Sequence, residues 1–174
     1  YAVPSSSVVQ TISNKKEMDR FIKSLMSRMT LEEKIGQLSQ YVGHDLLTGP
    51  QSEALSDSLL SKGAVGSILN IGGVQKIKKI QEKNMSVSRL KIPILFAYDV
   101  IHGYRTIFPT PLAEACSWDL DLMYETAKAA SIEASASGIH WTFAPMVDIA
   151  RDPRWGRVVE GAGEDTYLGC VIAQ

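Results

Sequence analysis

Residues 64–100 read AVGSILNIGGVQKIKKIQEKNMSVSRLKIPILFAYDV, and this stretch decides the fold. It opens on an apolar run at 64–71, breaks at a glycine pair that forms a plain turn, and closes on a second apolar run of strand length. Between the runs, Val74, Ile77 and Ile80 recur at the spacing of one helix face. We therefore predict a strand, a helix and a second strand, which is the building block of a parallel α/β sheet.

The same pattern repeats further along the chain. Apolar residues stripe a helix from Leu120 to Ala134, and Gly138 suits its end. Residues 140–149, HWTFAPMVDI, are of strand length and rich in β-favouring residues, so we expect a third strand that ends near Asp148. If the sheet closes into a barrel, a site is expected at the carboxyl ends of these strands.

Asp99 is the last polar residue of the second strand. A carboxylate at the end of a buried strand is costly unless something solvates or pairs it. One interpretation makes Asp99 a partner of Arg105 or of another nearby cation. The other makes it part of a binding site, because a second polar cluster follows the neighbouring third strand. Two such clusters on adjacent strand ends point to one face of the sheet.

The second cluster is the loop RDPRWGR, residues 151–157. A guanidinium is a fixed fork of donors that matches carboxylates or pairs of hydroxyls, and Trp155 offers a flat apolar face. Acidic residues follow at once, so a loop that only holds its own shape is an equal alternative to a binding site. We expect six residues to support the loop: Arg151, Asp152, Arg154, Glu160, Glu164 and Asp165.

Three long motifs resemble glycoside hydrolase family 3 of the β-glucosidase type. They are APMVDIARDPRWGRVVEGAGEDTYLG, PILFAYDVIHGYRTIFPTPLAEACSWD and the opening MTLEEKIGQL, and together they span about Met29 to the last residue. The resemblance implies a (β/α)8-like first domain and a retaining mechanism on β-linked sugars. It also implies that Asp99 and Arg157 bind substrate by gripping hydroxyls of the sugar in the innermost subsite.

The chain departs from the family in length, because a barrel takes about 250 residues and only three strands are evident here. We expect an incomplete TIM-barrel-like α/β domain over residues 14–174: N-terminal helices and about three βα units. Residues 1–13 are predicted to be a loose lead-in. The family's aspartate nucleophile and its acid/base have no matching position, so we expect no catalytic residue within this chain and both groups downstream.

Two helices are predicted before the first strand. Apolar residues from Met18 to Met29 fall at helical spacing, and Thr30 with Glu33 forms a capping-box pattern that starts a new helix. Residues 51–62 suit a further short helix, which Gly63 can end.

Composition excludes several classes of function. A formal charge of −1 and a pI near 6.3 give no field that would collect nucleic acid, and no stretch approaches the roughly 20 apolar residues of a membrane span. No ligand-spaced His or Cys set suggests a metal, and no cofactor is implied. Cys116 and Cys170 are expected to be buried apolar residues. The start at Tyr1, without methionine, suits an exported protein, so we expect a periplasmic or secreted location.

The preferred function is hydrolysis of terminal β-linked glucosyl residues by the full-length enzyme, with an oligosaccharide or β-glucoside as substrate. The missing C-terminal part of the same polypeptide is the expected partner. Two alternatives stay open: an N-acetylglucosaminidase of the same family, and a non-catalytic sugar-binding module. A part-barrel alone leaves strand edges and apolar surface exposed, so the isolated piece is expected to be inactive, and either to self-associate or to depend on the missing segments.

Overall fold

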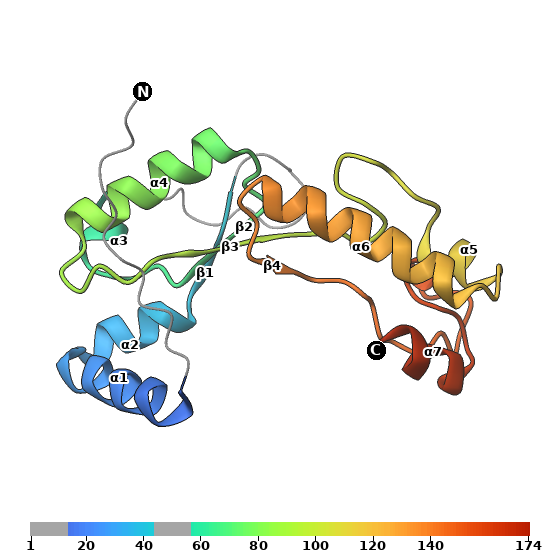
Figure 1. Ribbon diagram of the computed structural model, residues 1–174, viewed down its shortest axis with the longest axis horizontal. Coiled ribbons are helices and arrows are strands. Elements are labelled where there is room, and N and C mark those ends of the chain that lie inside the picture. The colour runs from blue at the N-terminus through green and yellow to red at the C-terminus, as the bar shows by residue number, and fades with distance from the viewer. Residues whose placement is uncertain (1–13, 44–56) are drawn as a thin grey trace.

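The computed structural model describes residues 14–43 and 57–174 (Figure 1). The lead-in expected over residues 1–13, and part of the helix expected over 51–62, lie outside these residues. The helices are α1 (Lys15–Arg28), α2 (Leu31–Leu38), α3 (Asp57–Ser61), α4 (Val74–Val87), α5 (Pro111–Ala115), α6 (Leu120–Ala136), the 3₁₀ helix η1 (Val158–Glu160) and α7 (Thr166–Ile172). The strands are β1 (Gln40–Val42), β2 (Ser67–Leu69), β3 (Leu95–Tyr98) and β4 (Trp141–Thr142).

The four strands form one parallel sheet in the order β1-β2-β3-β4. Each strand pairs with the one before it in sequence, so the order never reverses. A steady order of this kind is that of a (β/α)8 barrel, whereas a doubly wound sheet reverses at a switch point. Figure 1 shows α4 and α6 on one side of this sheet, as barrel helices lie. The predicted incomplete α/β barrel is confirmed.

Two predictions about the strands need correction. The sheet contains β1, a short strand that we did not predict because three residues carry too little periodicity. β4 ends at Thr142, six residues before Asp148, although we expected the strand to end near Asp148. Thr142 pairs with Tyr98, the last residue of β3, so the apolar run leaves the sheet where its partner strand ends.

Helix boundaries follow local capping chemistry. The Thr30 Oγ1 accepts from the Glu33 N–H and the Glu33 carboxylate accepts from the Thr30 N–H, so the predicted capping box begins α2. Gly63 and Gly138 follow α3 and α6 with φ of 65° and 89°. A left-handed conformation after a helix is where glycine costs least, as the sequence indicated.

Glu33 also ties α2 to the loop between α4 and β3. Arg89 donates from Nε at 3.0 Å and from Nη2 at 2.6 Å to the two Glu33 oxygens, and a further bond from Nη2 reaches the Arg28 carbonyl at 2.8 Å. Hydrogen bonds from Arg89, and then from the Thr30 N–H, hold the pKa of Glu33 below its ordinary value. One buried carboxylate therefore joins a helix cap to a distant loop.

The apolar residues gather in two clusters. The larger lies between the sheet and the helices α4 and α6, around Ile68, Ile94 and Phe96. The smaller joins α5, the first turns of α6 and α7 through Ala115, Met123 and Leu168. The second cluster anchors the segments that follow β3 and β4. The predicted burial of Cys116 and Cys170 is wrong: both are exposed, because each lies on the outer side of its short segment.

Candidate functional site

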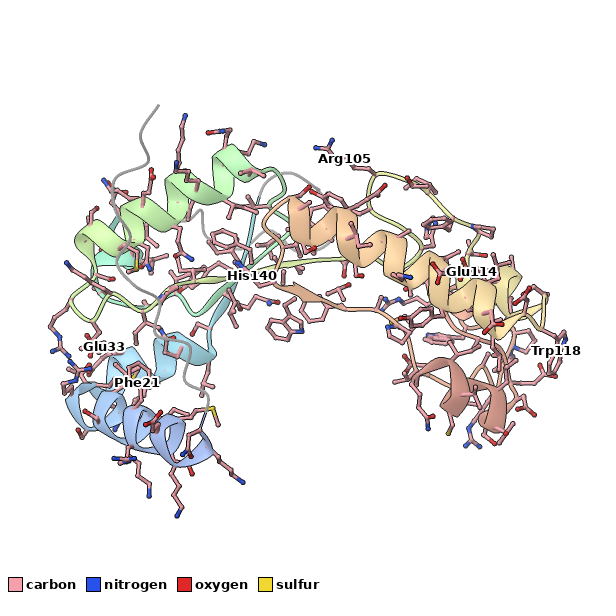
Figure 2. The ribbon with its side chains drawn as sticks, in the orientation of Figure 1. Phe21, Glu33, Arg105, Glu114, Trp118 and His140 are labelled. Atoms are coloured by element: carbon pink, nitrogen blue, oxygen red, sulfur yellow. The ribbon has the colours of Figure 1, made fainter. Side chains whose placement is uncertain are left out.

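Asp99 follows β3 directly and is exposed at the carboxyl end of the sheet. Its N–H donates to the side-chain Oδ1 of Asn70, at the end of β2, over 3.4 Å. Among the ion pairs of residues 14–43 and 57–174, none involves Asp99. The alternative in which Arg105 pairs with Asp99 therefore finds no support, and Figure 2 shows the Arg105 side chain pointing outward from its loop.

The loop after β3 is instead held by Glu133 of α6. The two carboxylate oxygens accept from the N–H groups of Arg105 and Thr106, each at 2.9 Å, and from the Thr106 hydroxyl at 2.6 Å. These bonds, led by the Thr106 hydroxyl, lower the pKa of Glu133. Asp99 thus begins a loop whose middle residues are fixed to a long helix.

The loop after β4 folds back on itself before it reaches α7. Met146 forms a parallel bridge with Gly161, and the Ala150 N–H donates to the Gly163 carbonyl at 3.1 Å. Within this loop, the 3₁₀ turn of η1 brings Arg157 and Glu160 together: Nε lies 3.0 and 3.1 Å from the two Glu160 oxygens, and Nη2 lies 2.6 Å from Oε2.

Arg157 and Asp99 lie within electrostatic reach of one another. The pKa of Arg157 is raised chiefly by its hydrogen bonds to Glu160, with smaller contributions from the negative charges of Asp148 and Asp99. The same pairing lowers the pKa of Glu160. The charges of Asp99, directly after β3, and Arg157, in the loop after β4, therefore act on one another, and a carboxylate with a guanidinium is a combination suited to ring hydroxyls.

The other predicted loop residues separate into three groups. Arg154 pairs with Asp152, from Nη2 to Oδ2 at 2.6 Å, and this pairing lowers the pKa of Asp152. Asp165 caps α7, because its Oδ1 accepts from the Leu168 N–H at 2.7 Å. Arg151 and Glu164 are exposed and belong to no ion pair in the described part of the chain. A supporting role for these residues stays a prediction.

Two residues near Asp99 were missed by sequence reasoning. Asn70 lies inside an otherwise apolar run, and a polar amide just before a glycine pair was the available signal. Glu133 lies in the second half of α6 with no partner nearby in sequence. Its contacts are 27 and 28 residues away, so no local pattern predicts them.

Asp99 and Arg157 line neither of two cavities that are found in the described part of the chain. The larger, about 350 Å³, lies between α4 and the start of β4 and is lined by Ile77, Met85 and His140 among others. The smaller lies beside Glu33, Asn84 and Ser88. The two candidate sugar-binding residues are exposed, so further residues would have to surround a sugar to form a closed subsite.

Residues 14–43 and 57–174 contain no cluster of three or more His, Cys, Asp or Glu side chains arranged to hold a metal ion. Within the same residues, no helix combines the length and apolar character required to cross a bilayer.

The chain belongs to glycosyl hydrolase family 3: the model of that family's N terminal domain matches residues 30–174. Among curated proteins, it is 44% identical over 158 residues to a periplasmic β-glucosidase of Salmonella typhimurium, covering 90% of this chain and 20% of that protein.

Solved structures give the same result. The structure is similar to a β-glucosidase from Listeria innocua in complex with isofagomine, with a TM-score of 0.78 and 42% identity over 88% of this chain and 21% of the other. A variant of that enzyme in complex with laminaribiose gives a TM-score of 0.76 and 40% identity, over 88% and 22%. The chain spans about a fifth of the length of these relatives.

Proposed function

We propose that the intact protein hydrolyses terminal β-linked glucosyl residues with retention of configuration, and that this chain supplies part of the innermost sugar subsite. The observation that supports the proposal is that the charge of Asp99, directly after β3, acts on Arg157 in the loop after β4, although the two residues come from motifs far apart in sequence. Membership of the family and the similarity to two β-glucosidases support it.

The division of roles follows from the chemistry of the two groups. The Asp99 carboxylate accepts hydrogen bonds from ring hydroxyls, while the Arg157 guanidinium donates to them. The binding energy of such contacts orients the substrate for cleavage of its glycosidic bond. Retention needs two carboxyl groups about 5–5.5 Å apart, one as nucleophile and one as acid/base. We assign neither role to a residue of this chain and expect both downstream in the polypeptide.

The substrate proposed is a β-glucoside or an oligosaccharide with a terminal β-linked glucose. The Listeria enzyme variant bound to laminaribiose supports this class.

We also propose a periplasmic or secreted location, which the name of the Salmonella relative supports. Cell fractionation followed by an assay of each fraction tests the location, and activity confined to the cytoplasmic fraction would contradict it.

The test of function uses the intact polypeptide and three aryl glycosides: a β-glucoside, a β-xyloside and an N-acetyl-β-glucosaminide. We expect the glucoside to be cleaved fastest. Asp99→Asn should lower kcat/KM by roughly 100-fold, because charge-assisted hydrogen bonds are lost. Asp121→Asn, an exposed aspartate on α6, is the matched control and should have little effect.

Other outcomes assign the alternatives. Fastest cleavage of the glucosaminide would make the protein an N-acetylglucosaminidase. Binding of glucose with no hydrolysis of any glycoside would make it a sugar-binding module. Full activity in the Asp99→Asn variant would remove Asp99 from the subsite.

A further inference from the structure

The ladder between β2 and β3 ends in an unusual way at Asn70. The N–H of Asn70 donates to the Ala97 carbonyl at 2.9 Å, as a regular parallel ladder requires. Its backbone then turns into the left-handed region, with φ of 60°, and its side chain stays buried with only 3% exposed. Asparagine is one of the few residues that adopt this conformation routinely.

The turn removes the next acceptor of the ladder. In a regular parallel ladder, the main-chain oxygen of residue 70 would accept from the N–H of Asp99. That oxygen is turned toward the end of β1 instead, since a Cβ atom placed on Gly43 would lie 2.9 Å from it. The Asn70 side-chain Oδ1 takes the vacated position and accepts from the Asp99 N–H at 3.4 Å.

We propose that Asn70 is a positioning residue for Asp99: its side-chain oxygen replaces the missing main-chain acceptor and fixes the backbone from which the sugar-binding carboxylate projects. The inference rests on the proposed function, because it takes Asp99 to bind sugar hydroxyls. Because burial restricts the Asn70 side chain to few rotamers, its oxygen stays in position to accept from the Asp99 N–H.

The middle of the same loop is restrained independently. Glu133 accepts from the N–H groups of Arg105 and Thr106, six and seven residues after Asp99. Of these two restraints, only Asn70 bonds Asp99 itself. A change at Asn70 is therefore expected to act on the carboxylate directly, whereas a change at Glu133 acts through the loop.

Asn70→Gly is the informative substitution. Glycine adopts the left-handed conformation freely and keeps the N–H bond to Ala97. It removes the side-chain acceptor together with the buried volume of the side chain, and the cycle below separates the two effects. In the intact polypeptide, we expect kcat/KM for an aryl β-glucoside to fall about five- to ten-fold, the size of one hydrogen bond. Asn70→Asp keeps an oxygen acceptor and should stay closer to the unsubstituted protein.

A double-mutant cycle separates positioning from general damage. If Asn70 acts through Asp99, Asn70→Gly should cause no further loss in the Asp99→Asn protein. The good leaving group of an aryl glucoside keeps that residual rate measurable. An equal loss in both backgrounds, or no loss from Asn70→Gly alone, would overturn the inference while leaving the proposed function intact. No loss from Asp99→Asn would overturn the inference and remove Asp99 from the subsite, whereas no hydrolysis of any aryl glycoside by the unsubstituted protein would overturn the proposed function.

Discussion

The guanidinium of Arg157 forks onto the carboxylate of Glu160, three residues further along the same loop. The two side chains are 55% and 27% exposed, so the pair lies at the surface with the acid as its more buried member. The fork uses the Nε and Nη2 donors out of the five N–H donors of a guanidinium. Glu160 therefore orients Arg157 and leaves N–H donors outside the fork, which the proposed contact with a sugar would use.

Glu160→Gln tests this orientation. The amide cannot accept the fork with both oxygens, so Arg157 should lose its fixed direction. We expect KM for an aryl β-glucoside to rise about three- to ten-fold. Stability should change little, because exposed ion pairs contribute little. Steady-state kinetics and thermal unfolding of the intact polypeptide measure the two effects.

Asp152→Asn is the comparison variant, because it removes a similar ion pair, with Arg154, from the same loop. The effect of Asp152→Asn on KM should be smaller, because no contact between Arg154 and the sugar is proposed. Equal effects of the two substitutions would mean that the loop as a whole, and not the direction of Arg157, controls binding.

The elements that could be predicted from sequence are those whose signal is local. The capping box of α2, the glycines after α3 and α6, and the strand–helix–strand unit around α4 depend on residues a few positions apart. Asp99 was placed correctly after β3 because a lone carboxylate at the end of an apolar run has few explanations.

What could not be predicted depends on tertiary contacts. In sequence, Asn70 is a polar residue within an apolar run, and its role is visible only from its contact with Asp99 at the end of β3. Glu133 resembles other acidic residues of an exposed helix face, and its role is visible only from its contact with Thr106. The early end of β4 was missed because the length of a strand depends on its partner: β3 ends at Tyr98, which pairs with Thr142, and no pattern within residues 140–149 indicates this.

Glu33 makes stability depend on acid pH. Its pKa is held below the ordinary 4.5 by Arg89 and by the Thr30 N–H. Because the folded pKa is lower than the unfolded one, this contribution is complete above about pH 4.5 and is lost as pH falls through the folded value. We expect Glu33→Gln to lower the midpoint of thermal unfolding at pH 7, and the difference between variant and parent should shrink toward pH 3. A difference that stays constant over this range would contradict the assignment.

Glu133 should control the motion of the loop that begins at Asp99. Glu133→Gln removes the charge that accepts two N–H bonds and one hydroxyl bond. We expect amide hydrogen exchange at Arg105 and Thr106 to accelerate about ten-fold or more. Glu125→Gln on the same helix is the control, because Glu125 pairs only with Lys128 at the surface in the described part of the chain. If exchange at both amides is unchanged in Glu133→Gln, the carboxylate does not restrain the loop.

The apolar surface of α1 and α2 predicts how the isolated 174-residue chain behaves. Leu31 and Leu38 of α2 are 69% and 89% exposed. Phe21 of α1, labelled in Figure 2, is also exposed. Exposed apolar surface of this kind favours association unless another segment covers it. We expect the isolated chain to self-associate in size-exclusion chromatography and to hydrolyse no aryl glycoside. Leu38→Ser should shift the chain toward monomer, whereas Tyr124→Ser, at an exposed position on α6, should not. A monomeric, active preparation of the unsubstituted chain would contradict both the predicted self-association through this surface and the expectation that the chain holds no catalytic residue.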